Sequence, residues 1–257
     1  MLALIAALTI AKVSSGAQAV QSGTAGGHAS AALVGELASV PTSTLNAVGA
    51  GTAGQGAFNS VPTKTSGAAL TSKGLPQVLY VGGEFCPYCA AERWAVTVAL
   101  SHFGNFHNLG TTASSPSDVF PNTASLSFHG ASFSSSSLAF NGYEIFSNQA
   151  QGSGFAPLDK LPPAANALFQ ASGGSIPYIN IGGKYVLSGA SLNPGLLAGK
   201  TSAQIAAALS NPSSPIAKAI DGTANVITAA VCNVTGGQPG SVCNSAGVVA
   251  AQAKVGG

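Results

Sequence analysis

The chain has 257 residues, enough for one domain with extensions or for two small domains. Only 6% of the residues are charged and the formal net charge is +2, without any run of Lys or Arg. This composition excludes nucleic-acid binding through a basic patch. The surface must consist mostly of Ser, Thr, Asn, Gly and Ala, which suits an exported protein because such a surface changes little with pH.

The N-terminus has features of an export signal. Residues 2–11 form a short apolar run, and Ala17-Gln18-Ala19 has the small-x-small form of a signal-peptidase site. The run is shorter than the roughly 20 residues of an ordinary membrane span. We therefore expect residues 1–19 to be a signal peptide or a truncated membrane anchor, with a buried N-terminal helix as the alternative. The expected location is extracytoplasmic, either secreted or anchored at the outer face of the membrane.

Residues 20–74 form a low-complexity segment rich in Gly, Ala, Ser and Thr. Two pieces, 31–40 and 44–48, have enough apolar residues to predict short helices, and Pro41 divides them. The segment that follows has clearer order. Residues 77–81 are apolar and β-branched and end at Gly82-Gly83, which predicts a buried strand.

A helix is expected over residues 87–102, because good helix formers continue without a break and Pro87 suits the first turn. Further along the chain, the sequence predicts a strand at 125–129 and a helix within 158–171. A β-hairpin is predicted at 178–187, where Gly182-Gly183 separates two apolar runs. Two helices close the chain, one at 201–209 with Thr201 as its cap and one at 215–235 that contains Cys232.

Cys86 and Cys89 lie at the predicted junction between the strand and the helix. A cysteine at a helix N-terminus is close to unpaired backbone N–H groups and to the positive end of the helix dipole, and both stabilise a thiolate. Two intervening residues let the second sulfur resolve a mixed disulfide on the first. We therefore expect Cys86 to be the exposed nucleophile and Cys89 the buried resolving thiol.

Two other interpretations of this cysteine pair are weaker. Zinc usually needs a second close pair of ligands, and neither the other cysteines nor the four histidines have that spacing. A purely structural disulfide in so small a loop would add little stability. No metal or other cofactor is therefore expected.

The segment Ser175-Ile176-Pro177-Tyr178 precedes the predicted hairpin. Here the sequence resembles the thioredoxin superfamily, in which a cis-proline precedes the third strand and faces the CxxC motif. The resemblance implies an α/β, thioredoxin-like fold with a helical insertion before the cis-proline strand and helical N- and C-terminal extensions. The thioredoxin-like domain would span residues 75–210, and residues 211–257 would be a helical extension. Phe85, Tyr88, Ile176 and Pro177 would form the substrate-binding rim.

Several longer motifs narrow this resemblance. They are residues 83–95, 109–112, 118–123 and 173–177, which together are similar to an uncharacterised bacterial and archaeal family, domain of unknown function 929. That family has no established substrate, so the resemblance supports a fold more than an activity.

One position departs from thioredoxin. Thioredoxins carry a buried carboxylate six residues before the first cysteine, and this chain has Tyr80 there. Glu84 is a candidate for proton transfer. Glu92 is either another shuttle or, as favoured, a solvated side chain. Arg93 either steadies the thiolate or lies along the surface, and Trp94 is expected in the core.

Cys232 and Cys243 form a second pair, joined by a Gly- and Pro-containing segment that allows the sulfurs to meet. We expect a structural disulfide between them. The alternative is a second redox pair that relays electrons to Cys86 and Cys89.

Two functions from different classes remain open. The first is an exported thiol–disulfide oxidoreductase or isomerase whose partners are protein or peptide thiols and disulfides and a further redox protein. The second is a redox-inactive binding or structural module with two stabilising disulfides. The CxxC motif favours the first, and the absence of the buried acid at position 80 favours the second.

Overall fold

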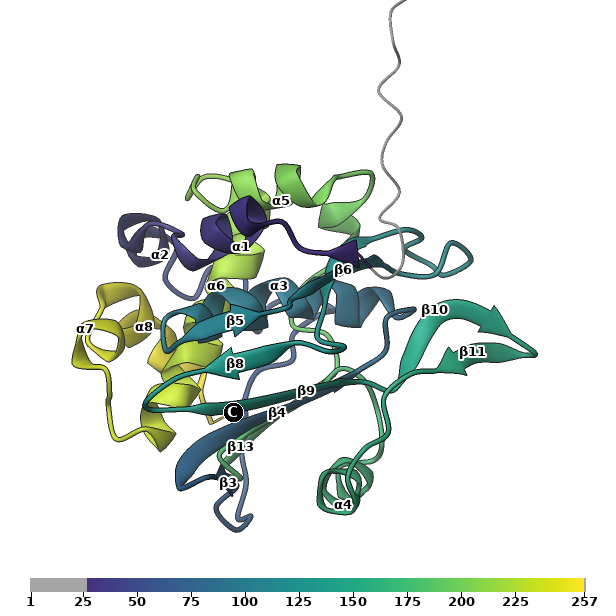
Figure 1. Ribbon diagram of the computed structural model, residues 1–257. Helices are drawn as coiled ribbons and strands as arrows, with labels where there is room; N and C mark the ends of the chain where they lie inside the picture. The colour runs from purple at the N-terminus through teal and green to yellow at the C-terminus, as the bar shows by residue number, and fades with distance from the viewer. Residues whose placement is uncertain (1–26, 257) are drawn as a thin grey trace, which may run out of the picture.

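The structure is a computed structural model that describes residues 27–256, so the predicted leader at 1–19 lies outside the described residues. It is a mixed α/β protein (Figure 1). The central sheet contains β2, β13, β12, β4 and β9 in that spatial order, and β3 pairs with the start of β4. The bounds of these strands are β2 Thr63–Lys64, β3 Thr71–Ser72, β4 Leu75–Gly82, β9 Ala139–Glu144, β12 Tyr178–Ile181 and β13 Tyr185–Ser188.

The strand β4 is the centre of this sheet. It runs parallel to β9 and antiparallel to β12, and β12 forms the predicted hairpin with β13. Side chains alternate between the two faces of a strand. Accordingly, Val78 and Tyr80 belong to one hydrophobic cluster, and Leu79 and Val81 belong to another. Because both faces are covered, the strand is apolar throughout its second half.

Helices cover the two faces of the sheet unequally. The predicted helices at 87–102 and 215–235 are present as α3 (Pro87–Ser101) and α6 (Pro215–Val234), which lie side by side on one face (Figure 1). The short helix α4 (Pro163–Ala171) lies on the other face, where Phe169 packs on the second cluster. The sequence placed residues 211–257 in a separate extension, but α6 is buried along most of its length against α3 and so completes the same core.

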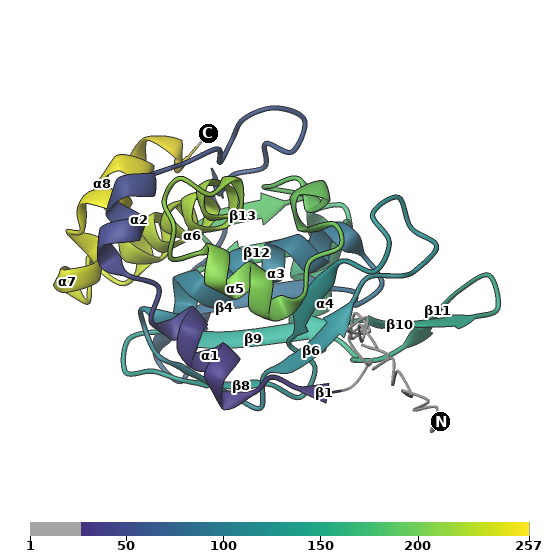
Figure 2. The same cartoon turned by 90° about the horizontal axis from the view of Figure 1, so that it is seen from above.

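The N-terminal helices are close to their predicted positions. They are α1 (Ala31–Ala38) and α2 (Thr42–Val48), with Pro41 between them. Figure 2 shows both helices beside α5 and α8, on the side of the molecule that is seen from above. Leu37 is 0% exposed, so this low-complexity segment contributes to the core. The remaining helices are α5 (Ser202–Ala208), α7 (Gly240–Cys243) and α8 (Ala246–Ala251). Thr201 caps α5 in a capping box with Gln204, as expected.

The prediction of a helical insertion was wrong for most of the segment between α3 and β12. The sequence led us to expect a helical insertion, but α4 is its only helix within the described residues. The rest is mostly strands, which form small sheets around β9. They are β5 (Asn105–His107), β6 (Gly110–Ala113), β7 (Ala124–Ser127), β8 (Ser132–Ser134), β10 (Phe146–Gln151) and β11 (Gly154–Pro157). The short strand β1 (Gly27–His28) pairs with β6. No helix of residues 27–256 is long and apolar enough to cross a membrane.

The hairpin of β10 and β11 projects from the body of the protein beside the N-terminal end of α3 (Figures 1 and 2). Backbone hydrogen bonds join its base to the end of β4, because Glu84 N–H donates to Phe146 O at 2.9 Å and Ile145 N–H donates to Gly82 O at 2.8 Å. The parallel pairing of β4 and β9 therefore continues into the loop that carries the cysteine motif.

Candidate functional site at the start of helix α3

The cysteine motif lies where β4 passes into α3, as the sequence predicts. Cys86 is the N-cap residue of α3, with an extended backbone, and Pro87 occupies the first turn. The proline fits there because the first N–H groups of a helix have no intrahelical partner. The backbone N–H of Cys89 donates a hydrogen bond to Cys86 Sγ at 3.2 Å. The site therefore offers the Cys86 sulfur a donor that an ordinary cysteine lacks.

Both cysteines are free thiols, and they differ in environment. The pKa of Cys86 is lowered from its ordinary value by a hydrogen bond with the Cys89 side chain, and also by the Cys89 N–H and the charge of Arg93, against the opposing effect of burial. Burial raises the pKa of Cys89 well above its ordinary value, and the hydrogen bond to Cys86 adds to this. The arrangement favours the thiolate at Cys86 over the thiolate at Cys89.

The predicted exposure of Cys86 needs correction. Cys86 is 5% exposed and Cys89 is 0% exposed. Cys89 is the more buried of the two, as expected, but Cys86 has only a small opening to solvent. The sequence could not show this, because the groups that surround Cys86 come from distant loops.

One wall of the site is an aromatic group on the β10–β11 hairpin. The ring of Phe85 stacks on Phe155 with centroids 4.2 Å apart and meets Phe146 edge-on at 6.3 Å. Phe146 is 37% exposed. The predicted rim residue Phe85 is therefore joined to the projecting hairpin.

A second aromatic group is built around Tyr88. The Tyr88 ring lies 5.9 Å from Phe58 and 6.0 Å from Phe120 between centroids. Phe120 belongs to the loop after β6, which contacts the motif directly, since Ser115 N–H donates to Phe85 O at 2.8 Å. The same loop carries Val119, which is 72% exposed. Phe85 and Tyr88, which stand on either side of Cys86 in the sequence, therefore each belong to an aromatic group.

Ile176 and Pro177 lie near the loop that precedes Cys86. The Ile176–Pro177 peptide bond is cis, as expected. Pairing of Tyr178 with Val81 brings Pro177 to the level of Gly82, beside the loop that leads to Cys86. A Cβ atom on Gly83 would lie 2.8 Å from the Phe85 ring and 3.3 Å from Ile176 Cδ1. The absence of a side chain at Gly83 thus allows Phe85 and Ile176 to pack close to the Gly83 backbone.

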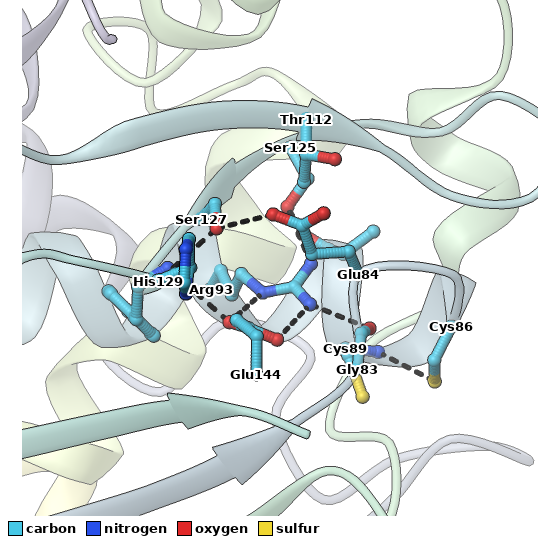
Figure 3. A network of polar contacts seen from close by, with 12 residues as sticks. Gly83, Glu84, Cys86, Cys89, Arg93, Thr112, Ser125, Ser127, His129 and Glu144 are labelled. Carbon is cyan, nitrogen blue, oxygen red and sulfur yellow. Dashed lines mark hydrogen bonds and ion pairs between the residues drawn. The ribbon is translucent and has the colours of Figure 1, made fainter. Parts of the chain in front are cut away.

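A buried ion pair lies behind the motif (Figure 3). Arg93 Nε and Nη2 donate to the two carboxylate oxygens of Glu144, at 2.8 and 2.6 Å, and both side chains are 0% exposed. Arg93 Nη2 also donates to Gly83 O at 2.7 Å, and Nη1 donates to Ser125 Oγ at 3.2 Å. Arg93 does not lie along the surface, so that alternative was wrong. Trp94 is in the core, as predicted.

The two candidate acids are both buried. Glu84 is 6% exposed and accepts a hydrogen bond from Ser127 Oγ at 2.6 Å, which turns its carboxylate toward β7 and away from the sulfurs (Figure 3). Glu92, which we expected to be solvated, is 0% exposed and accepts hydrogen bonds from Ser191 N–H and Oγ at 3.2 and 3.1 Å. Burial raises its pKa to about 7. The structure brings neither carboxylate into hydrogen-bond contact with a cysteine.

Tyr80, six residues before Cys86 on β4, has an unusual environment. It is 0% exposed, and its hydroxyl has no hydrogen-bond partner among the described residues. Its ring packs edge-on against Phe128 at 4.9 Å. Burial raises the pKa of Tyr80 well above its ordinary value, so the hydroxyl is neutral at every physiological pH. Tyr80 therefore supplies no negative charge beneath the dithiol.

The second cysteine pair is the predicted disulfide, with Cys232 and Cys243 joined. Cys232 lies near the end of α6, and Val234 packs on Gly182 at the turn of the β12–β13 hairpin. That turn is at the opposite end of β12 from Pro177. Figures 1 and 2 likewise show α7 and the β10–β11 hairpin on opposite sides of the molecule. The structure therefore does not bring the two cysteine pairs together.

Sequence reasoning missed most of the groups that complete the site. Glu144, Ser125, Phe120 and Phe155 all come from the insertion, which lacks a regular apolar pattern. One signal was available for Arg93, because residues four apart on a helix share a face and Cys89 is expected to point inward. Among residues 27–256, no group of three or more His, Cys, Asp or Glu side chains is placed to hold a metal ion.

Comparison with known proteins gives one match. No curated protein and no solved structure matches the chain. The model of the family described as "Domain of unknown function (DUF929)" matches residues 61–154, a segment that contains β4, the cysteine motif, Arg93 and Glu144. Residues 61–154 are therefore similar to the DUF929 family, in agreement with the resemblance carried by the motifs at 83–95, 109–112 and 118–123.

Proposed function

We propose that the protein is a thiol–disulfide oxidoreductase or isomerase that acts on protein or peptide disulfides through Cys86 and Cys89. The observation that carries the proposal is the hydrogen bond from Cys89 N–H to Cys86 Sγ at the start of α3. A sulfur at this position has a lowered pKa and a neighbouring thiol that can resolve the intermediate.

The reaction follows from this difference between the thiols. The Cys86 thiolate attacks one sulfur of a substrate disulfide and forms a mixed disulfide, and the second substrate sulfur leaves with the electron pair and takes up a proton. Cys89 then loses its proton and attacks Cys86 Sγ, which releases the first substrate sulfur as a thiol. The substrate gains two electrons, and the protein gains a Cys86–Cys89 disulfide. The reverse sequence oxidises a substrate dithiol.

The order of elements supports a thioredoxin-like fold for this chemistry. A strand, the CxxC motif, a helix, a distant Ile-Pro, a hairpin and a closing helix follow one another in β4, α3, β12–β13 and α6. A parallel neighbour, β9, flanks β4 on the side away from the hairpin. We propose that the strand-rich insertion is an elaboration of that fold.

We further propose that the protein works outside the cytosol. The Cys232–Cys243 disulfide supports this, because structural disulfides persist in oxidising compartments. The apolar run at 2–11 and the small-x-small site at 17–19 point the same way.

One observation favours the alternative, a redox-inactive module, and it is the 5% exposure of Cys86. A trapping experiment decides between the two functions. The Cys89→Ser variant should accumulate a mixed disulfide with a cysteine-containing peptide, because the first attack proceeds and nothing resolves it. The Cys86→Ser variant is the matched control and should trap nothing. If neither variant forms a mixed disulfide with the peptide, the result would favour the redox-inactive module.

A further inference from the structure

Arg93 is tied to the backbone that carries the nucleophile. Its Nη2 donates to Gly83 O at 2.7 Å, and the backbone N–H of Cys86 donates to the same oxygen at 3.2 Å. The guanidinium is therefore separated from the Cys86 backbone by a single shared acceptor. A second link passes through Ser125, whose hydroxyl accepts from Arg93 and donates to Ala90 O at 2.9 Å. The side chain braces both the loop before the motif and the first turn of α3.

Arg93 also lies on the same helix face as the resolving thiol. It follows Cys89 by four residues on α3, a spacing that makes side chains neighbours. Both residues are 0% exposed. Arginine keeps its charge in proteins, so a positive charge acts on Cys89 in the dry interior, opposed by the Glu144 carboxylate that is paired with it.

This ion pair is poorly explained by stability alone. Burying two charges costs desolvation energy that their attraction barely repays, and apolar residues of similar size often serve a fold as well. The Glu144 oxygens, Gly83 O and Ser125 Oγ satisfy the guanidinium. The fork geometry of arginine suits such a set of acceptors, and a lysine would lose it.

We propose that Arg93, held in place by Glu144, is a positioning residue of the dithiol: it fixes the loop that carries Cys86 and stabilises the thiolate of Cys89 in the resolving step. The inference rests on the proposed function. In that step the Cys89 thiolate forms a bond to Cys86 Sγ, the bond between Cys86 and the substrate breaks, and the substrate sulfur receives the electron pair and then a proton. A nearby positive charge favours the Cys89 thiolate and so assists the loss of its proton to solvent, which matters because Tyr80 supplies no carboxylate to accept that proton.

The ion pair allows a test in which two variants must act in opposite directions. Arg93→Met removes the positive charge, so the thiolate is less stable and the reduced protein is less favoured. Glu144→Gln removes the negative charge that opposes the thiolate, so the reduced protein is more favoured. A merely structural role would weaken the site in both variants and move both in the same direction.

The measurement is the equilibrium of Cys86 and Cys89 with glutathione, together with the pH profile of thiolate absorbance, on the full chain. We expect Arg93→Met to shift the exchange constant toward the disulfide by about tenfold, which is about 30 mV, and Glu144→Gln to shift it the other way. Asp221→Asn is the control, because it replaces a buried carboxyl on α6 that has no hydrogen bond to Arg93 or the cysteines. It should leave the exchange constant unchanged.

Arg93→Lys keeps the positive charge and loses the planar, two-pronged donor geometry of the guanidinium. If Arg93→Met does not fold, the test uses Arg93→Lys together with Glu144→Gln. Arg93→Lys should preserve most of the exchange constant and slow the resolving step. If the exchange constants of Arg93→Met and Glu144→Gln shift in the same direction, or do not shift, the inference is overturned. The proposed function would still stand if the wild-type protein exchanges disulfides. A wild-type protein that exchanges no disulfide would instead refute the proposed function, and the opposite shifts in thiol pKa would still test the ion pair.

Discussion

Cys86 Sγ accepts a hydrogen bond from the backbone N–H of Cys89 at 3.2 Å, across the first turn of α3. This contact joins the cap of a helix to the CxxC motif, because the donor is one of the N–H groups that every helix start leaves unpaired. The nearby Arg93 and Glu144 extend the same arrangement into the core.

The first prediction concerns the titration of Cys86. Its hydrogen bonds with Cys89 and the charge of Arg93 lower its pKa, so the thiolate should persist at a lower pH than in a free cysteine, whose pKa is about 8.5. Alkylation rates measured against pH should reach half their maximum below that value in the Cys89→Ser variant. A profile centred at or above 8.5 would show that the helix start does not activate Cys86.

A second prediction concerns the aromatic wall. Replacement of Phe85 by Ala removes the stack on Phe155, and an aromatic pair contributes about 1 kcal/mol beyond its buried area. We expect KM for a cysteine-containing peptide disulfide to rise by about tenfold while kcat for a small aliphatic disulfide changes little. Equal losses for both substrates would mean that Phe85 supports the motif and does not bind the chain.

The third prediction uses the Cys232–Cys243 disulfide. Closing a loop with a sequence separation of 11 residues contributes about 3 kcal/mol to stability in the chain-entropy account. The double Ser variant should lose about that much in urea unfolding. It should still exchange disulfides at the wild-type rate, because the two cysteine pairs lie at opposite ends of β12. Loss of turnover in a folded variant would instead favour the electron relay.

A fourth prediction concerns pH and Asp221. Burial raises its pKa from 3.8 to about 8, and neither carboxylate oxygen has a hydrogen-bond partner among residues 27–256. The contribution of the protonated group to stability is complete below about pH 4 and is lost as pH rises toward 8, because the unfolded chain ionises first. The wild-type Tm should therefore fall between pH 5 and 8.

The Asp221→Asn variant isolates that effect. It should unfold at a higher Tm than wild type at pH 8, by several degrees for a gain on the order of 2 kcal/mol, and its Tm should vary less with pH. Glu92, whose pKa is about 7, should account for part of the slope that remains. A pH dependence identical to that of wild type would show that Asp221 is ionised in the folded protein.

The elements that sequence could predict are those with local signals. The apolar run of β4, Pro87 at the start of α3 and Gly182-Gly183 between β12 and β13 each fix a structure within a few residues. The cysteine motif follows from the same local reasoning, because its chemistry depends on the junction between one strand and one helix.

The parts that could not be predicted depend on contacts between distant residues. Glu144 meets Arg93 across 51 positions and Glu92 meets Ser191 across 99, and charged residues are by default expected at the surface. The sequence predicts one strand of the insertion, at 125–129, and β7 (Ala124–Ser127) is found there. The other strands of the insertion are short and polar, so their sequence lacks the alternation that identifies a strand. Phe120, Phe146 and Phe155, which pack against the aromatic residues of the cysteine motif, also come from these segments.

The reduction potential of the Cys86–Cys89 pair tests the central claim most directly. It can be measured on the full chain by equilibration with glutathione, with thiol alkylation to count the reduced fraction. A dithiol at a helix start, with one thiolate and one protonated thiol, should have a potential between about −270 and −120 mV, as in known dithiol oxidoreductases. A value below about −300 mV, typical of inert structural disulfides, would contradict a role in thiol–disulfide exchange.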